Sequence, residues 1–229
     1  MEYTTLGRTG LKVSVAGLGC GGPSRLGLRA ASDSTDHAVA LIKQALDLGV
    51  NFLDTAETYG TESVIGKAIK GMAREKLVIS TKKTLPPPGH PNPEEEVRVG
   101  LEQSLKQLDT DYLDIYHLHG VEPNDFDHAK KRLMPAMRRL KEQGKIRFIG
   151  VTEAFVEDPQ HRMLQDSLKE DLWDVVMAGF SLLNPSARKT VFPLTRQKRA
   201  GMLNMFAVRR GLSQPQYRLR VDDIRVFHD

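Results

Sequence analysis

The feature that most constrains the fold is an alternation of short apolar or β-branched runs with longer amphipathic segments. The short runs start about every 30 residues, which is the length of one strand–helix unit of a parallel sheet. A chain of such units forms either a closed (β/α)8 barrel or an open doubly wound sheet. The predicted strands cover residues 15–20, 51–56, 77–82, 112–119, 147–153, 175–183 and 203–208. Helical patterns lie near residues 36–49, 62–73, 94–108, 128–143, 159–170 and 186–200.

A predicted β-hairpin precedes the first of these units. Residues 3–5 and 11–13 flank a glycine-containing turn, and a hairpin at this place suits the bottom of a barrel. No linker or low-complexity stretch interrupts the chain, so we expect residues 1–229 to form a single domain. Residues 221–227 favour one further short strand, but no glycine-rich loop follows them. Seven strands can be counted in the repeat, one fewer than in a closed (β/α)8 TIM barrel. An incomplete α/β barrel of about seven units and an open doubly wound sheet therefore both stay open at this point.

Composition and charge exclude several classes of protein. Hydrophobic residues make up 40% and charged residues 27% of the chain, which is typical of globular proteins. The net charge of +4 is too small to indicate a nucleic-acid partner, and a single cysteine, Cys20, is typical of a reducing compartment. The sequence has neither a signal-peptide pattern nor an apolar run of about 18 residues. We expect a cytoplasmic protein that acts on a small molecule, with no nucleic-acid or membrane partner; its oligomeric state is open.

Residues 17–22 contain the pattern Gly-x-Gly-x-x-Gly directly after the first predicted strand. In dinucleotide-binding folds this pattern opens a helix at its third glycine, so that the helix N-terminus meets the pyrophosphate. Here Pro23 follows, and the next helical pattern begins near residue 36. A glycine-rich loop at a barrel mouth, with room for substrate or cofactor, therefore fits better, and Gly21 is a candidate cofactor contact.

Four ionisable residues fall at or just beyond the ends of the second, third and fourth predicted strands: Asp54, Tyr59, Lys82 and His119. Taken singly, each has a structural interpretation, such as a helix cap, a packing aromatic or a surface lysine. The ends of consecutive parallel strands, however, converge on one face of a barrel, where active sites lie.

Together these four residues predict proton transfer to an oxygen. Lys82, kept charged by Asp54, is expected to lower the pKa of Tyr59. Tyr59 is expected to exchange a proton with a carbonyl or alcohol oxygen, to which His119 donates a hydrogen bond. The set contains no nucleophile paired with a base, which favours a reaction in which another molecule delivers a hydride.

The sequence resembles the aldo-keto reductase family in four segments that occur in the family's order. These are residues 51–60 (NFLDTAETYG), 77–82 (LVISTK), 111–119 (DYLDIYHLH) and 144–151 (GKIRFIGV). The resemblance implies an (α/β)8 barrel and NADPH-dependent reduction of aldehydes or ketones. The reverse reaction, which oxidises an alcohol or a sugar lactol, stays open. The use of NADH in place of NADPH as the cofactor stays open as well. It also implies that Asp54, Tyr59, Lys82 and His119 are the family's catalytic tetrad, with Tyr59 as proton donor.

The sequence departs from the family where the cofactor binds. The family usually has Ser-Asn after the fifth strand to hold the nicotinamide carboxamide, whereas this chain has Thr152 and Glu153, which the resemblance assigns to the same contact. An ionised Glu153 can accept a hydrogen bond from the amide but cannot donate one. The glutamine usual on the sixth strand is absent, and Phe180 is the candidate to stack near the nicotinamide, a core phenylalanine being the alternative. The segment that grips the adenosine phosphate in the family is expected to be missing.

Two other functions stay open on the sequence. The first is a catalytically impaired nucleotide-binding barrel, if the absent eighth unit prevents turnover. The second is a metal-dependent hydrolase, because His117 and His119 lie two residues apart on one strand and face the same way. The sequence shows no further histidine at a strand end to complete a metal site.

Overall fold

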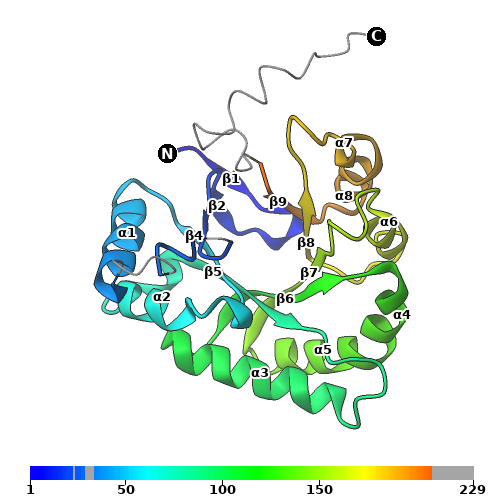
Figure 1. Cartoon of the computed structure of the whole chain (residues 1–229), viewed down its shortest axis with the longest axis horizontal. Helices are drawn as coiled ribbons and strands as arrows, with labels where there is room; N and C mark the ends of the chain where they lie inside the picture. Colours follow the sequence, from blue (N-terminus) through cyan, green and yellow to red (C-terminus); the bar gives the residue numbers. More distant parts are fainter. Residues whose placement is uncertain (23, 29–33, 208–229) are drawn as a thin grey trace.

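Seven parallel strands form one sheet in the order in which they occur along the chain. The computed structural model describes residues 1–22, 24–28 and 34–207. The strands are β3 (Leu18–Gly19), β4 (Phe52–Asp54), β5 (Val78–Thr84), β6 (Leu113–Val121), β7 (Ile146–Glu153), β8 (Val175–Gly179) and β9 (Gly201–Met205). The sheet curls around a common interior and the helices surround its outer side (Figure 1). This arrangement confirms the predicted α/β barrel class, with an incomplete barrel of seven parallel strands among the described residues.

The seven predicted strands of the repeat are present within the described residues, with shifted ends. The run predicted over 175–183 ends as a strand at Gly179, because Ser181 and Asn184 exchange main-chain hydrogen bonds of 3.1 and 3.2 Å in a tight turn. The first strand is shorter than predicted, and β9 begins earlier, at Gly201. The end of the predicted strand 203–208 and the predicted strand 221–227 lie outside the described residues.

Helices follow the strands along the chain, as the alternating pattern predicts. They are α1 (Thr35–Asp47), α2 (Glu62–Ile69), α3 (Pro93–Leu108), α4 (Phe126–His128), α5 (Met134–Glu142), α6 (Arg162–Ser167), α7 (Ala187–Thr190) and α8 (Phe192–Lys198). The single helix predicted over 128–143 is instead α4, a π-helical turn (Ala129–Leu133) and α5. Helix α3 starts at Pro93 and carries three glutamates in its first turn, where proline and acidic side chains are favourable.

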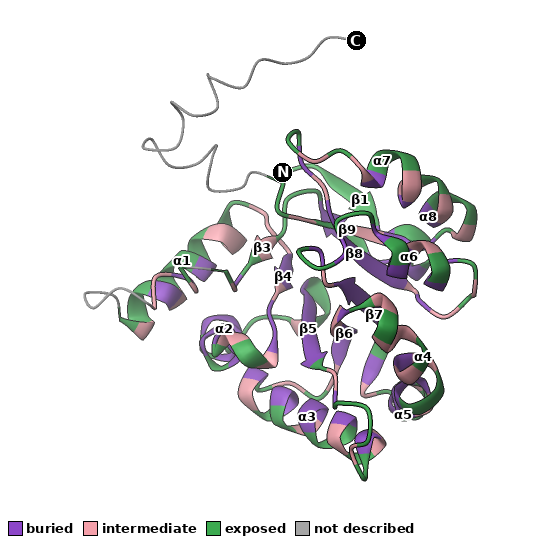
Figure 2. Ribbon diagram, turned by 45° about the vertical axis from the view of Figure 1, so that its right-hand side comes forward, coloured by how far each residue is buried: buried purple, intermediate pink, exposed green. Residues whose placement is uncertain are grey.

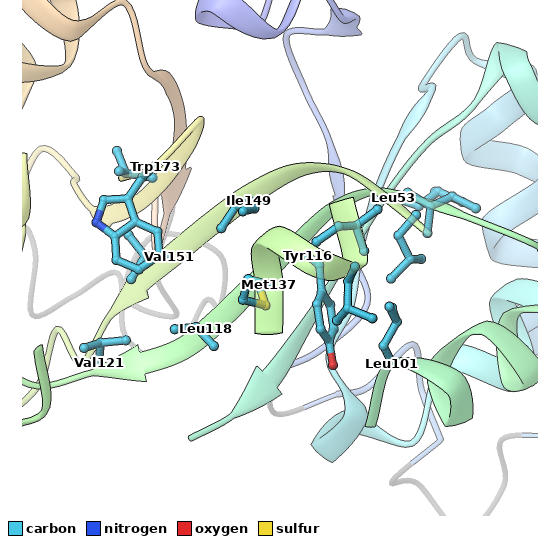
Figure 3. Close-up of a cluster of buried hydrophobic side chains, with 14 of the residues drawn as sticks. Leu53, Leu101, Tyr116, Leu118, Val121, Met137, Ile149, Val151 and Trp173 are labelled. Carbon is cyan, nitrogen blue, oxygen red and sulfur yellow. The ribbon is translucent and has the colours of Figure 1, made fainter. Parts of the chain in front are cut away.

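Alternation of side chains along the strands produces two separate packed regions. Leu53, Tyr116 and Leu118 belong to the large cluster between the sheet and the helices. Figure 3 shows this cluster, in which Leu101 of α3 and Met137 of α5 lie beside residues of β6. In Figure 2 the strands are mostly buried, while the helices carry exposed residues on their outer sides.

The second packed region lies inside the barrel and contains the N-terminal hairpin. Strands β1 (Tyr3–Thr5) and β2 (Lys12–Ser14) pair antiparallel, as predicted. The buried side chains of this region are Leu6, Leu11, Val13, Phe52, Val78, Ile115 and Val175. Because Phe52, Val78 and Val175 are the first residues of their strands, the hairpin closes the N-terminal end of the barrel. The candidate site can therefore lie at the opposite end of the barrel, where the strands have their C-terminal ends.

Gly66 lies where α2 packs closely against α3, and it gives a first test of the packing. A Cβ at Gly66 would lie 2.6 Å from the carbonyl oxygen of Gln107. Helix propensity alone predicts that Gly66→Ala stabilises by about 1 kcal/mol. We expect the clash with backbone to dominate, so that the free energy of unfolding in urea falls by about 1–3 kcal/mol. Exposed Ser63 on the same helix supplies the control: Ser63→Ala should change it by less than about 0.5 kcal/mol. A more stable Gly66→Ala protein would contradict this packing.

Candidate active site

The structure brings the four predicted catalytic side chains together at the C-terminal ends of β4, β5 and β6. Asp54 is the last residue of β4, Lys82 lies near the end of β5, and His119 lies near the end of β6. Tyr59 comes from the 3-10 turn Glu57–Tyr59 that follows β4. The parallel register accounts for the convergence, because it sets the ends of neighbouring strands side by side.

Lys82 and Asp54 form a buried ion pair on the inner side of the barrel. The Lys82 Nζ lies 2.6 Å from Asp54 Oδ2 and 2.7 Å from the carbonyl oxygen of Thr55. Ser80 donates a hydrogen bond of 2.9 Å to the other carboxylate oxygen. Lys82 is only 1% exposed, so its charge depends on these partners. The neighbouring Lys83 pairs instead with Glu57 and Glu96. Lys82 is therefore the lysine that lies beside Asp54 and the Tyr59 ring.

The hydroxyl of Tyr59 and the imidazole of His119 meet at one point. The Tyr59 oxygen lies 3.5 Å from His119 Nε2, and the two rings are nearly perpendicular, at 82°. The Nζ of Lys82 lies 5.2 Å from the centroid of the Tyr59 ring. The hydroxyl of Tyr59 and the imidazole of His119 are thus both placed to donate a hydrogen bond to one substrate oxygen atom. The ammonium group of Lys82 lies beneath the Tyr59 ring.

The electrostatics of Tyr59 differ from the sequence-based expectation. Burial, and after it the negative charge of Asp54, raises the pKa of Tyr59 to about 12. The predicted lowering by Lys82 is therefore wrong for this structure. The physical reason is that the ammonium group of Lys82 is bound to Asp54 and to Thr55, over the face of the ring, and does not contact the hydroxyl. Tyr59 is consequently a protonated acid at neutral pH.

His119 is neutral at physiological pH. Burial, and then the positive charge of Lys82, lowers its pKa to about 4. A neutral imidazole carries one N–H and one lone pair, so it can donate a single hydrogen bond through its protonated nitrogen. This suits a residue that binds a substrate oxygen without competing with Tyr59 to protonate it.

Gly21 lies against the ring of Tyr59. A Cβ at this position would lie 2.3 Å from the ring carbon Cε2, closer than real Cβ contacts come. The glycine-rich loop therefore leaves space for the ring of Tyr59, and this contact explains the residue type at Gly21. Its assignment to the cofactor stays a prediction.

Thr152 and Glu153, the predicted carboxamide contacts, have separate surroundings. Thr152 is buried, and its Oγ1 accepts a hydrogen bond of 2.7 Å from the N–H of Gly120. The Glu153 carboxylate accepts the Gly179 N–H at 2.7 Å and lies 2.8 Å from His161 Nδ1. Successive side chains of a strand point to opposite faces, which explains the separation. The carboxylate of Glu153 is thus engaged with protein groups, and its contact with the amide of the cofactor stays a prediction.

Phe180 also takes the alternative role that the sequence left open. Its ring centroid lies 4.9 Å from that of Phe192 on α8, and the guanidinium carbon of Arg188 lies 5.5 Å from the Phe180 centroid. The side chain packs against the core between sheet and helices. Stacking of Phe180 on a nicotinamide stays a prediction.

The sequence analysis missed His161 and Ser186. His161 lies in a segment predicted as helix, with no neighbouring motif, yet its imidazole bridges Glu153 and Ser186. The unusual glutamate at position 153 is the one signal that could have prompted a search for a partner.

His117 lies within the barrel and is fully buried, and a Cβ at Gly150 would lie 2.2 Å from its Nδ1. Within residues 1–22, 24–28 and 34–207, no three His, Cys, Asp or Glu side chains are grouped so that they could hold a metal ion. The hypothesis of a metal-dependent hydrolase using His117 and His119 therefore gains no support from the geometry.

In the described parts of the chain, none of the helices is both long and apolar enough to span a bilayer.

Comparison with known proteins identifies the class to which this barrel and site belong. The family model for the aldo/keto reductase family matches residues 18–224, so the chain belongs to this family. L-galactose dehydrogenase of Arabidopsis thaliana is 32% identical over 222 residues, which are 94% of this chain and 68% of that protein.

Solved structures of the family resemble the fold. An aldo-keto reductase from Bacillus halodurans in its holo form gives a TM-score of 0.73 at 27% identity, covering 89% of this chain and 65% of that one. A reductase from Klebsiella pneumoniae in complex with NADP and acetate gives 0.69 at 27% identity, covering 89% and 67%. The chain thus spans 65–68% of the length of these relatives.

Proposed function

We propose that this chain is an NADPH-dependent oxidoreductase that reduces an aldehyde or ketone, with Tyr59 as the proton donor. The observation that carries the proposal is the hydroxyl of Tyr59 beside His119, above the buried Asp54–Lys82 pair. The Klebsiella pneumoniae reductase was solved with NADP, which supports the choice of cofactor. The similarity to an L-galactose dehydrogenase supports a sugar lactol or alcohol as substrate of the reverse reaction.

The chemistry of the four side chains fits NADPH as the partner. They can bind an oxygen and move a proton, but they supply no electron pair that would reduce a carbonyl carbon. Bound NADPH supplies the hydride. Thr152 is the residue that we assign to the carboxamide, because its oxygen accepts the Gly120 N–H and its own proton is left for the amide carbonyl.

The protein's part of the reaction follows from the geometry. The substrate oxygen accepts hydrogen bonds from Tyr59 and from neutral His119, whose reacting atoms lie 3.5 Å apart. As negative charge develops on this oxygen, Tyr59 transfers its proton to it. The phenolate that remains lies near the ammonium group of Lys82, whose charge offsets part of the cost that burial and Asp54 impose on the anion.

A pH profile tests the protonation states. Because the pKa of Tyr59 is about 12 and that of His119 about 4, the protonated tyrosine and neutral histidine coexist from about pH 5 to pH 10. We expect kcat/KM for reduction, followed by NADPH absorbance, to be nearly constant over this range. Oxidation needs the phenolate, whose fraction rises tenfold per pH unit below its pKa, so its kcat/KM should rise with pH throughout. A plateau of the oxidation rate near pH 7 would contradict a raised pKa.

The activity itself is tested by NADPH consumption with a panel of aldehydes, ketones and aldoses, together with an NADPH titration. We expect turnover of at least one carbonyl class. A nucleotide-binding barrel with little turnover is the second candidate, favoured by the engagement of Glu153 and Phe180 with other protein groups. Tight NADPH binding without consumption of any carbonyl would support this second function and overturn the first.

A further inference from the structure

A second cluster of chemically competent side chains joins β7, the start of α6 and the loop after β8. The His161 Nδ1 lies 2.8 and 2.9 Å from the two carboxylate oxygens of Glu153, and its Nε2 lies 2.7 Å from the Oγ of Ser186. The side chains of Glu153 and His161 are fully buried, whereas Ser186 is partly exposed. We propose that Glu153, His161 and Ser186 form a serine-hydrolase triad that cleaves esters of apolar acyl groups.

The carboxylate determines the role of the imidazole. With the Nδ1 proton donated to Glu153, the lone pair of His161 is on Nε2 and faces the serine hydroxyl. The main-chain N–H of Gly179 donates to the same carboxylate at 2.7 Å, so Glu153 is held in one orientation. A triad is recognised by such geometry and not by the order of its members in the chain.

The backbone at His161 is unusual. Its φ is +61° and its ψ is +31°, a left-handed conformation that few residues other than glycine adopt. Such conformations cluster at functional sites, where the surrounding structure maintains them. The conformation here places the imidazole between Glu153 and Ser186 at the start of α6.

Ser186 is held at the imidazole, and the turn that precedes it carries two exposed leucines. The Ser186 hydroxyl donates a hydrogen bond of 2.6 Å to Asn184 Oδ1, so this proton must turn to His161 Nε2 before the serine acts as a nucleophile. The tight turn before Asn184 exposes Leu182 by 84% and Leu183 by 45%. Exposed leucines on the loop that carries the nucleophile suit the acyl chain of an ester, which is why we name apolar esters as the substrate class.

The reaction needs only ester and water. The Ser186 Oγ bonds to the ester carbonyl carbon while its proton passes to His161 Nε2, and Glu153 stabilises the resulting imidazolium. The bond from carbon to the alcohol oxygen then breaks, and His161 gives its proton to the departing alkoxide, leaving an acyl group on the serine. Water attacks this acyl-enzyme with His161 again as base, which releases the carboxylic acid and restores the serine hydroxyl.

A fluorophosphonate probe tests the triad on the intact chain. We expect one phosphonyl adduct per chain by intact mass, mapped to Ser186 by peptide analysis, and hydrolysis of p-nitrophenyl butyrate. Ser186→Ala should remove both signals without unfolding the protein, which circular dichroism checks, because the side chain is partly exposed. Ser63→Ala, on exposed α2 surface, is the matched control and should react like the unchanged chain.

The variant Glu153→Gln distinguishes a catalytic triad from a hydrogen-bond network that only holds the loops together. The amide keeps the shape of the side chain but favours the wrong tautomer of His161, so labelling should slow by about 10⁴-fold. Absence of an adduct on Ser186 would overturn the proposal. So would equal labelling of folded Glu153→Gln and the unchanged chain, or butyrate hydrolysis that persists in Ser186→Ala. If Glu153→Gln does not fold, the Ser186→Ala comparison decides alone.

Discussion

Tyr59→Phe should lower kcat for carbonyl reduction by about 10²- to 10⁴-fold, the contribution that a general acid makes. The substitution removes only the hydroxyl, while the ring still packs against Gly21. The lost contact to His119 is a long one, 3.5 Å, so the free energy of unfolding should change by less than about 1 kcal/mol. The affinity for NADPH, measured by fluorescence titration, should be unchanged because the proton donor acts on the substrate oxygen.

Tyr116→Phe is the matched control for this prediction. Tyr116 lies on the outer side of β6, and its buried hydroxyl has no hydrogen-bond partner among the residues that the structure describes. The same chemical change there should leave kcat unaltered and should not destabilise the protein, because it removes an unsatisfied polar group. A Tyr59→Phe protein that reduces carbonyls as fast as Tyr116→Phe would show that Tyr59 is not the proton donor.

The second large effect is expected from Asp54→Asn, which removes the charged partner of a buried lysine. Lys82 is 1% exposed and lies 2.6 Å from the Asp54 carboxylate, so the substitution leaves an uncompensated charge in the interior. We expect the free energy of unfolding in urea to fall by about 3–5 kcal/mol. Catalysis should also be lost, because the ammonium group is no longer held below Tyr59.

The double variant Asp54→Asn/Lys82→Met isolates the cause of this loss. Methionine is an apolar residue of similar length, so no charge is left buried and much of the stability should return, although activity should not. If the double variant were as unstable as Asp54→Asn alone, the loss would come from the hydrogen bond of Ser80 to the carboxylate and not from the charge of Lys82. The two urea curves therefore decide which interaction matters.

The catalytic cluster could be predicted because its members are marked by local pattern. Asp54, Lys82 and His119 each follow an apolar run that reads as a buried strand, and parallel strands end at one face of a barrel. The surroundings of the predicted cofactor contacts could not be inferred in the same way. The direction of a side chain at a strand end depends on where the strand stops and which face it presents, and Glu153 and Phe180 both point to groups that a linear pattern does not reveal.

The strand–helix repeat, the hairpin and the residues gathered at the site can all be inferred from the amino-acid sequence. These follow from side-chain periods and strand lengths, which are properties of neighbouring residues. The tertiary structure alone decided the protonation state of Tyr59, because burial and the position of Asp54 raise its pKa. It also decided that Glu153 meets His161 and Ser186, since that contact joins elements separated along the chain. Desolvation and long-range contacts exist only once the chain has folded, and they determine the chemistry of both sites.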